Sequence, residues 1–575
     1  MSASNAKGDE NAGSIRPLKI NYFLMKHLLF LFLFGSVTLN GHGQLLKARE
    51  IFSRADSLRG QLTPLRTCYN INYYHLDVRV DPDRHYISGS NLFQFTATED
   101  FSRLQFDLFD NLSIEKVVYQ TRELPFEREY NAVFIDFPQP IRKGQLDSFT
   151  VYYSGHPVQA KRAPWDGGFD FRKDSNGKHW IATACQGLGA SVWWPNKDHL
   201  SDEVDSMLIS ISVPTGLTNV SNGRFRGSED LGDGYTRFNW FVSNPINNYN
   251  VAANIGDYVH FADTFHGEKG ILDLDYWVLR ENEAKAKLHF DANVKPMLRA
   301  FEYWFGPYPF YADGYKLVET AHLGMEHQSA IAYGNKYQNG YLGRDGSGTG
   351  WGNKWDFIII HESGHEWFGN NMTAADLADM WIHESFTNYS EALYIDYHYG
   401  KRAGQEYIHG NRSGIQNLTS LVGSYGVNNE GSGDMYNKGG VLHNMVRVII
   451  NDDAKWRQIL RGLNKQFYHQ TVDYQDIVNY ISEQSGRNFA PMFAQYVRHP
   501  NLPTLEFYFH PDGKAYCRWM ADEPDFDMPV RIRAKGGNYR FIQPKRHLTS
   551  IDISGLTRDN LEVDTFNFYI GVLVE

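Results

Sequence analysis

The sequence predicts a multidomain α+β protein built from three parts. Alternating apolar and polar residues fill the first part, helical spacing fills the second, and strand-like alternation returns near the end of the chain. We therefore expect an N-terminal antiparallel β saddle or sandwich over residues 45–265, a mostly helical domain over residues 266–500 and a small β domain over residues 501–575. A chain of 575 residues is long enough for several domains of this kind.

Strand signals are densest between about residues 70 and 265. The segments YYHLDVRVD, YISGSNLFQFTATE, RLQFDLF, SFTVYYSG and MLISISVP all alternate apolar with polar side chains. Clusters of Gly, Pro, Asp and Asn separate these segments. This pattern is typical of a large antiparallel sheet structure.

Helical spacing begins after about residue 272. The segment ENEAKAKLHFDANVKPMLRAFEYWFG predicts a helix that ends at Gly306. Further helices are expected over residues 354–369, 381–397, 402–418, 438–450, 454–466 and 474–484. A glycine-rich stretch at 343–353 is expected to be a surface loop. After residue 500, the segments TLEFYFHPDG, MPVRIRA, YRFIQP and TFNFYIGVLVE predict strands again.

Composition restricts the classes of function. The net charge of −11 gives no support for nucleic-acid binding, which requires a basic surface. The chain has only three cysteines, far apart, so no disulfide framework and no CxxC zinc ribbon is expected. Any metal site must therefore use histidine and carboxylate ligands.

The N-terminal segment has the layout of a secretory signal. MKHLLFLFLFGSVTLNGHGQ begins at Met25 with a basic residue, continues with an apolar run from Leu28 to Leu39, and ends in small and polar residues. The run is too short to span a bilayer comfortably. Residues 1–44 are therefore expected to be a signal peptide with an upstream extension. We expect an exported protein, periplasmic or extracellular, with no stable membrane span in the mature chain.

Four residues between 361 and 384 are spaced as in a metal site. His361 and His365 lie one helical turn apart, so both imidazoles face the same side and can share one ion. Glu384, on the next predicted helix, is the natural third ligand. Zn²⁺ accepts this donor set and keeps a fourth position for water. We expect one zinc ion per chain.

Glu362 is the expected general base. It follows His361 directly and is therefore offset from the face that carries the ligands. A zinc ion lowers the pKa of bound water to about 7 and polarises a carbonyl oxygen. Glu362 can then take the water proton and hand it to a leaving amine, which is metal-assisted amide hydrolysis.

The segment HESGHEWFGNNMT…WIHESFTNY resembles the gluzincin peptidases, and within them the aminopeptidase N family. HExxH, eighteen residues and then Glu is the gluzincin pattern, and Trp367, Phe368, Gly369, Asn370 and Trp381 match the aminopeptidase N version of it. His383 and Ser385 stand where that family has Asn and Gly. The resemblance covers about residues 68–500 and implies a thermolysin-like catalytic domain. It also implies a short member of the family, without the long helical C-terminal domain.

Three further matches carry roles from the family. Gly324, Met325 and Glu326 match the Gly-x-Met-Glu-Asn signature, whose Glu binds the substrate α-ammonium group, although His327 replaces the Asn. Tyr436 in MYNKGG corresponds to the tyrosine that stabilises the oxyanion. Gln186 in IATACQGLGA matches a Gln or Glu that helps to hold the substrate amine.

These observations predict an exported zinc aminopeptidase that acts on peptides with a free N-terminus. A thermolysin-like endopeptidase is one alternative, and Glu326 argues against it. A second alternative is a catalytically inactive peptide-binding or scaffold protein on the same fold, which the presence of both histidines and both glutamates disfavours. Epoxide hydrolase activity, as in the leukotriene-hydrolase relatives of the family, is not required by any feature. Side-chain preference and oligomeric state stay open.

Overall fold

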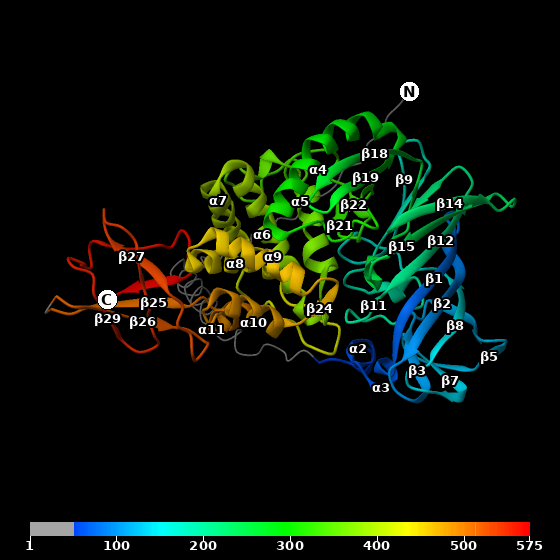
Figure 1. The fold of residues 1–575 in the computed structure, drawn as a ribbon, viewed down its shortest axis with the longest axis horizontal. Helices are drawn as coiled ribbons and strands as arrows, with labels where there is room; N and C mark the ends of the chain where they lie inside the picture. The colour runs from blue at the N-terminus through cyan, green and yellow to red at the C-terminus, as the bar shows by residue number, and fades with distance from the viewer. Residues whose placement is uncertain (1–50, 512) are drawn as a thin grey trace, which may run out of the picture. The chain divides into compact units, whose positions relative to one another are not determined.

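The computed structural model describes residues 51–511 and 513–575, which form the helices and strands drawn in Figure 1. The chain divides into two units, Met1–Ser53 and Arg54–Glu575, and the described helices and strands all lie in the second unit. The expected signal segment at 25–44 lies outside the described residues. The mixed β and helical architecture confirms the predicted fold class, with a β-rich N-terminal region, a helical region and C-terminal strands.

An eight-stranded sheet forms the centre of the N-terminal region. Its strand order is β14-β15-β12-β1-β2-β8-β4-β5. β1 pairs antiparallel with β2 and parallel with β12, so the sheet is mixed at this point. The strands are β1 (Tyr69–Asp81), β2 (Tyr86–Ala97), β4 (Leu112–Tyr119), β5 (Arg122–Leu124), β8 (Leu146–Gly155), β12 (Ser206–Pro214), β14 (Arg224–Asp230) and β15 (Tyr235–Val242).

Smaller sheets complete this region. They are β13-β17-β10-β9, β3-β7-β6 and the pair β11-β16. From Tyr74 onward, alternation buries every second side chain of β1, as the sequence predicts, and these side chains lie in one hydrophobic core with side chains of the smaller sheets. Their bounds are β3 (Phe101–Asp107), β6 (Phe126–Glu129), β7 (Ala132–Ile141), β9 (Gly168–Lys173), β10 (His179–Ala184), β11 (Glu203–Val204), β13 (Thr218–Val220), β16 (Ile246–Asn247) and β17 (Asn254–Gly256). Two short helices precede them, α2 (Arg54–Gly60) and α3 (Pro64–Thr67).

A five-stranded sheet precedes most of the helical region, in the order β18-β19-β20-β22-β21. The strands are β18 (Tyr258–Gly267), β19 (Gly270–Leu279), β20 (Tyr315–Glu319), β21 (Gly324–Met325) and β22 (Ile331–Tyr333). The expected domain boundary between residues 265 and 266 falls inside β18. The short strand β21 is the edge strand, and it carries the Gly324-Met325 pair singled out in the sequence.

The helices follow the predicted order. They are α4 (Glu283–Phe305), α5 (Phe357–Gly364), α6 (Trp381–Tyr399), α7 (Lys401–Asn411), α8 (Asn437–Ile450), α9 (Asp453–Gln466), α10 (Tyr474–Ser485) and α11 (Ala490–Arg498). A short parallel pair, β23 (Met372–Ala374) and β24 (Gln470–Val472), lies between them in sequence.

Two expected helices are shorter than predicted. α7 ends at Asn411, so the expected helix over 402–418 is wrong in its second half. The expected helix over 354–369 begins at Phe357 and is interrupted at Phe368 and Gly369, whose backbone angles are not helical. α11 was not predicted as a helix.

The C-terminal strands form two small sheets, β29-β26-β25-β31 and β28-β27-β30. Their bounds are β25 (Thr504–Phe509), β26 (Ala515–Met520), β27 (Val530–Ala534), β28 (Arg540–Ile542), β29 (Thr549–Ile551), β30 (Leu561–Val563) and β31 (Gly571–Val574). Leu505, Phe507 and Trp519 of these strands belong to the same hydrophobic core as the helices α4–α11. The C-terminal strands are therefore packed onto the helical region rather than built on a separate core.

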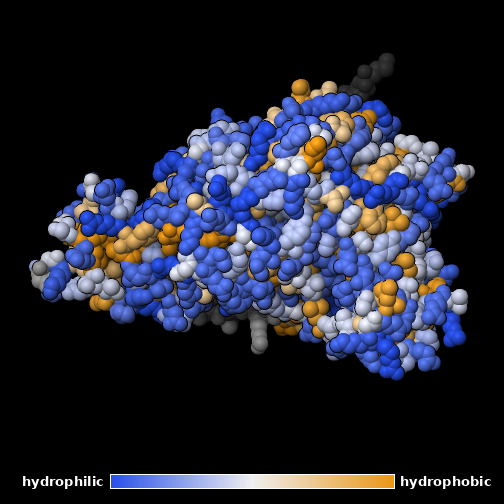
Figure 2. Space-filling view, in the orientation of Figure 1, coloured by the Kyte–Doolittle hydropathy of each residue, from blue (hydrophilic) through white to orange (hydrophobic). Residues whose placement is uncertain are grey.

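The face in Figure 2 is mostly hydrophilic, with hydrophobic residues gathered over the C-terminal β region. Within the described ranges, none of the helices combines the length and the apolar character needed to traverse a bilayer. Cys68, Cys185 and Cys517 are buried, and none of them forms a disulfide in the described part of the chain.

Candidate metal centre

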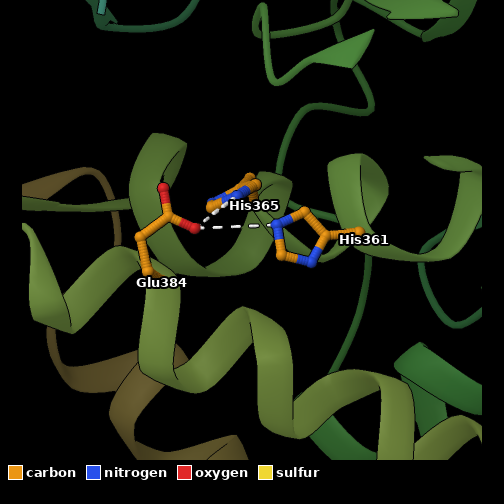
Figure 3. A group of neighbouring side chains, drawn as sticks. All are labelled: His361, His365 and Glu384. Atoms are coloured by element: carbon orange, nitrogen blue, oxygen red, sulfur yellow. Dashed lines mark ion pairs between the residues drawn. The ribbon is translucent and has the colours of Figure 1, made fainter. Parts of the chain in front are cut away.

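The three predicted metal ligands converge in the structure. His361 and His365 project from the end of α5, and Glu384 projects from the first turn of α6 toward both rings (Figure 3). Glu384 Oε2 lies 3.6 Å from His361 Nε2 and 3.4 Å from His365 Nε2. One ligand atom from each residue lies within 4.8 Å of the others, and all three side chains are buried.

The spacing of these atoms fits a zinc ion. Bonds of about 2.0–2.1 Å in a tetrahedron place neighbouring ligand atoms ~3.3 Å apart. The two observed separations, 3.4 and 3.6 Å, are close to that edge length. Glu384 Oε2 is buried and has no hydrogen-bond partner, so a cation bound between the three side chains would satisfy this oxygen.

The Nδ1 nitrogen of each histidine, which is not the nitrogen that faces Glu384, lies within hydrogen-bonding distance of an oxygen. His361 Nδ1 lies 2.7 Å from Glu391 Oε1, and the Tyr407 hydroxyl donates to the second oxygen of Glu391 at 2.6 Å. His365 Nδ1 lies 3.1 Å from the carbonyl oxygen of Phe368. A proton on each Nδ1 leaves each Nε2 with a free lone pair for the metal. Sequence reasoning missed Glu391.

Electrostatics favour an ionised Glu384. Burial alone would raise the pKa of its carboxyl, but the imidazoles of His365 and His361 lower that pKa well below its usual range. The carboxylate therefore carries its negative charge at neutral pH, as a metal ligand must.

Glu362, the predicted base, borders the same space. Burial raises the pKa of Glu362 to about 7, against the opposing effect of His361 and His365. A carboxyl with this pKa can both accept and release a proton near neutral pH. A Cβ at position 324 would lie 2.6 Å from Glu362 Oε1, so only glycine leaves this carboxylate in place.

Glu326 and Gln186 lie together beside the metal ligands. Gln186 Nε2 donates to Glu326 Oε1 at 2.8 Å and to Glu384 Oε1 at 3.2 Å. The Tyr249 hydroxyl also donates to Glu326 Oε1, at 3.0 Å. Glu326 is 3% exposed, and no lysine or arginine in the described part of the chain forms an ion pair with it. The structure thus brings together a buried carboxylate without a cation and the predicted metal site.

Tyr436 faces the centre from the residue before α8. Its ring lies 6.0 Å from the His361 ring, and 36% of the residue is exposed. Burial, together with the charges of Glu384 and Glu326, raises the pKa of the Tyr436 phenol well above its usual value. The group therefore keeps its proton and can donate it in a hydrogen bond.

His327 and His383, the two departures from the family pattern, are both buried and neutral. Burial lowers the pKa of each to about 3. His383 Nε2 accepts from the Ala374 N–H at 2.7 Å, so this ring supports the strand that precedes α6. Neither nitrogen of His327 has a hydrogen-bond partner among the described residues.

A cavity of about 430 Å³ joins these groups. Its walls include both histidines, Glu362, Glu384, Glu326, Gln186 and Tyr436. All of the predicted catalytic, metal-binding and substrate-binding residues are thus in one place, with Gly324 and Met325 on its wall as well. The three candidate ligands, the neighbouring glutamate and the cavity together form the arrangement expected from the gluzincin resemblance.

Comparison with known proteins shows similarity to one peptidase family. Residues 291–496 match the peptidase family M1 domain. Aminopeptidase N from Lactococcus lactis subsp. lactis is 25% identical over 243 residues, 39% of this chain and 28% of that protein. A probable aminopeptidase 1 from Saccharolobus solfataricus is 21% identical over 345 residues, 57% of this chain and 42% of that protein. The chain is therefore similar to peptidase family M1 over residues 291–496, and to aminopeptidases over part of its length.

A solved structure shares the fold. An M1 zinc metallopeptidase mutant from Deinococcus radiodurans, bound to a Tyr-Ser-Ala substrate, superposes with a TM-score of 0.63 at 19% identity, and covers 77% of this chain and 96% of that one. The matched regions span less than half of the two curated relatives named above, at 28% and 42% of their lengths.

Proposed function

We propose that this chain is an exported zinc-dependent aminopeptidase that removes the first residue of peptides with a free N-terminus. The observation that carries the proposal is the position of Glu326, a buried carboxylate without a cation, linked through Gln186 to the metal ligand Glu384. A substrate whose ammonium group meets Glu326 would place its first peptide bond near the metal and near Glu362.

The endopeptidase alternative fits this arrangement less well. An endopeptidase has to accept chain on both sides of the bond that it cuts. A buried carboxylate next to the metal penalises such a substrate, because an uncharged segment would leave the Glu326 charge without a partner. The aminopeptidase relatives and the tripeptide in the structural neighbour support the same choice.

His361, His365 and Glu384 would hold the zinc ion, which when bound activates water and polarises the peptide carbonyl. Glu362 accepts the proton of the attacking water and passes it to the departing nitrogen. The Tyr436 hydroxyl donates to the oxygen that becomes negative as water adds. Glu326 and Gln186 hold the ammonium group during these steps.

The test is the hydrolysis of aminoacyl chromogenic substrates with and without a chelator. We expect zinc-dependent turnover of substrates with a free amine and none of the same substrates with an acetylated amine. A protein that cleaved acetylated peptides internally would be an endopeptidase. A protein that bound zinc at the three ligands but cleaved neither substrate would be a binding protein on this fold.

Glu326→Ala separates the amine-binding role from a general structural one. We expect kcat/KM for free-amine substrates to fall by about 100-fold or more, because one partner of a buried charge pair is removed. Zinc content should not change. Glu483→Ala is the matched control, since Glu483 is exposed on α10. A Glu326→Ala enzyme with unchanged preference for free amines would contradict the role assigned to Glu326.

Export is part of the proposal and rests on the segment that begins at Met25. A basic residue followed by an apolar run and small polar residues is the pattern that secretion machinery recognises. The experiment is fractionation of the producing cells followed by sequencing of the mature N-terminus. A full-length, uncleaved chain in the cytosol would show that the segment is not a signal.

A further inference from the structure

One carboxylate in the cavity has no part in the proposed chemistry. Glu430 lines the same cavity as the metal ligands, and its residue is exposed. Among residues 51–511 and 513–575, none forms a hydrogen bond or ion pair with its carboxylate. Glu326 and Glu384 would be matched by the substrate amine and by zinc, whereas nothing in the proposed mechanism matches Glu430.

Glu430 lies on the amine side of the metal centre. Its loop contacts the segment that carries Gln186, because Asn428 Nδ2 donates to the carbonyl oxygen of Gly187 at 3.5 Å. Gln186 is the residue that donates to Glu326. Glu430, two residues after Asn428, therefore lines the cavity on the side of the Gln186 segment, and we assign the side chain of the first substrate residue to this side.

Hydrogen bonds fix the loop that carries Glu430 on both sides of this residue. The Tyr425 hydroxyl donates to Asp379 Oδ1 at 2.9 Å, and the Gly426 N–H donates to Asp376 Oδ2 at 3.0 Å. The Ser432 N–H donates to the carbonyl oxygen of Ser420 at 3.0 Å, which joins the two ends of the loop. A loop held in this way presents Glu430 at a defined place, as a specificity-determining group requires.

The electrostatic field at this end of the cavity favours another cation in addition to the ammonium group of the substrate. Although the residue is exposed by surface area, desolvation of its carboxyl by the surrounding protein and the nearby charge of Glu384 raise the pKa of Glu430, so a positive group beside it would relieve an unfavourable charge. Arg344 is the only arginine or lysine on the cavity wall within the described ranges. Arg344 belongs to the loop of Tyr341, which packs 5.4 Å from Phe357 at the start of α5, and not to the Gln186 side.

An aromatic ring adds to the same wall. Trp165 lines the cavity and is 69% exposed. Its turn lies next to the Gln186 segment, since a Cβ at Gly167 would lie 2.9 Å from the side chain of Leu188. An exposed indole face attracts a guanidinium or ammonium group.

We propose that Glu430 selects peptides whose first residue is arginine or lysine, by pairing with the side-chain cation at the amine end of the cavity. This inference rests on the proposed aminopeptidase function, because it assigns the side chain next to the amine. It makes Glu430 a specificity-determining residue rather than a part of the catalytic machinery.

The experiment compares substrates that differ in charge but hardly in shape. Arginine is paired with its neutral isostere citrulline, and lysine with norleucine, each as an aminoacyl chromogenic substrate with the zinc-loaded protein. We expect the wild-type kcat/KM to favour each cationic member by about tenfold or more. Glu430→Gln should reduce both ratios to near one while leaving citrulline and norleucine turnover unchanged.

Two variants sharpen the outcome. Glu430→Lys should make arginine a poorer substrate than citrulline, and the exposed control Glu483→Gln should leave both ratios as in the wild type. Equal turnover of arginine and citrulline by the wild type would overturn the assignment. An equal loss for all four substrates in Glu430→Gln would also overturn it, because Glu430 would then support catalysis and not selection.

Binding separates this inference from the proposed function. Calorimetric titration of the zinc-loaded protein with free L-arginine and free L-citrulline needs no turnover. If no substrate is cleaved but L-arginine binds more tightly than L-citrulline only when Glu430 is present, the selection stands and the peptidase activity does not. If all substrates are cleaved and the two amino acids bind equally, the activity stands and the selection does not.

Discussion

His361 is oriented by a carboxylate on the neighbouring helix. Glu391 lies seven residues after Glu384 (391 − 384 = 7), which places both on one face of α6. Glu384 approaches the Nε2 side of the imidazole, while Glu391 accepts from its Nδ1 side. One helix therefore supplies both a candidate ligand and the group that orients the imidazole of a second candidate ligand.

Glu391→Gln should weaken zinc binding without unfolding the protein. An amide keeps an oxygen for the Nδ1 proton but removes the charge that makes His361 a stronger ligand, so we expect about a 10- to 100-fold loss of zinc affinity. Competition with a chromogenic chelator measures it. Tyr407→Phe, which removes only the hydrogen bond to Glu391, is the comparison and should cost less. Equal zinc affinity in Glu391→Gln and the wild type would refute the orienting role.

Gly324 leaves space for the base. A Cβ there would approach Glu362 Oε1 to 2.6 Å and the Ile358 side chain to 2.9 Å, so the carboxylate would have to move. We expect Gly324→Ala to lower kcat by about 10- to 100-fold, because general-base catalysis depends on position. Zinc content and melting temperature should change little. Gly346→Ala, which meets no atom within 4 Å, is the control, and unchanged turnover at position 324 would show that Glu362 tolerates displacement.

At the scale of elements, the turn after α5 places a hydrogen-bond acceptor beside His365. Gly369 has φ 135°, and with Phe368 it bends the chain out of the helix directly after the second ligand. This bend brings the Phe368 carbonyl oxygen to His365 Nδ1. A continuous helix over 354–369 would direct that carbonyl along the helix axis instead. The interruption that the helical pattern did not predict is thus the feature that supports a ligand.

A carboxyl links a strand of the N-terminal region to one of the catalytic region. The Thr373 hydroxyl of β23 donates to Glu203 Oε1 of β11 at 2.5 Å. Burial raises the pKa of Glu203 from 4.5 to about 7. The folded state therefore binds this proton more tightly than the unfolded chain, so the stabilisation is complete below pH 4.5 and is lost as the pH rises through 7.

Glu203→Gln should remove this pH dependence. The amide resembles the protonated acid, so the variant should be more stable than the wild type at pH 8, by on the order of 1 kcal/mol, and equally stable near pH 4.5. Urea unfolding at both pH values measures the difference. Glu115→Gln, on an exposed position of β4, should show no such change. A constant difference at both pH values would mean that Glu203 does not titrate in this range.

At the scale of the whole molecule, the C-terminal strands share their core with the catalytic helices. Phe507 of β25 is fully buried in the cluster that also contains Trp381 of α6. The Arg412 guanidinium after α7 donates to the Thr565 carbonyl oxygen at 2.6 Å. The Tyr496 hydroxyl of α11 donates to the backbone carbonyl oxygen of Tyr569 at 2.7 Å. Unfolding of the two parts should therefore be coupled.

Phe507→Ala tests this coupling. Removing a buried phenyl ring costs about 3–5 kcal/mol. We expect urea to abolish activity and strand structure together, at a lower concentration than in the wild type. Phe541→Ala, at an exposed position of β28, is the control. Loss of strand structure at a concentration that leaves full activity would show that residues 501–575 unfold independently.

Much of this protein follows from local sequence patterns. Period-two alternation predicts the strands of the β-rich region, and helical spacing with Gly306 predicts the end of α4. The one-turn spacing of His361 and His365 makes two ligands neighbours wherever that helix lies. These predictions succeed because a helix or strand imposes its own period on the few residues that compose it.

Contacts between segments far apart in the sequence leave no periodic pattern from which they could be predicted. Gln186 meets Glu326 and Glu384 across 140 and 198 residues, and the loop of Glu430 meets Gly187 across 241. The departure of the chain from helix at Phe368 and the packing of β25 into the catalytic core also depend on neighbours far along the chain. Which side chain faces the substrate is set by the packing of whole elements, and short-range patterns carry no information on that packing.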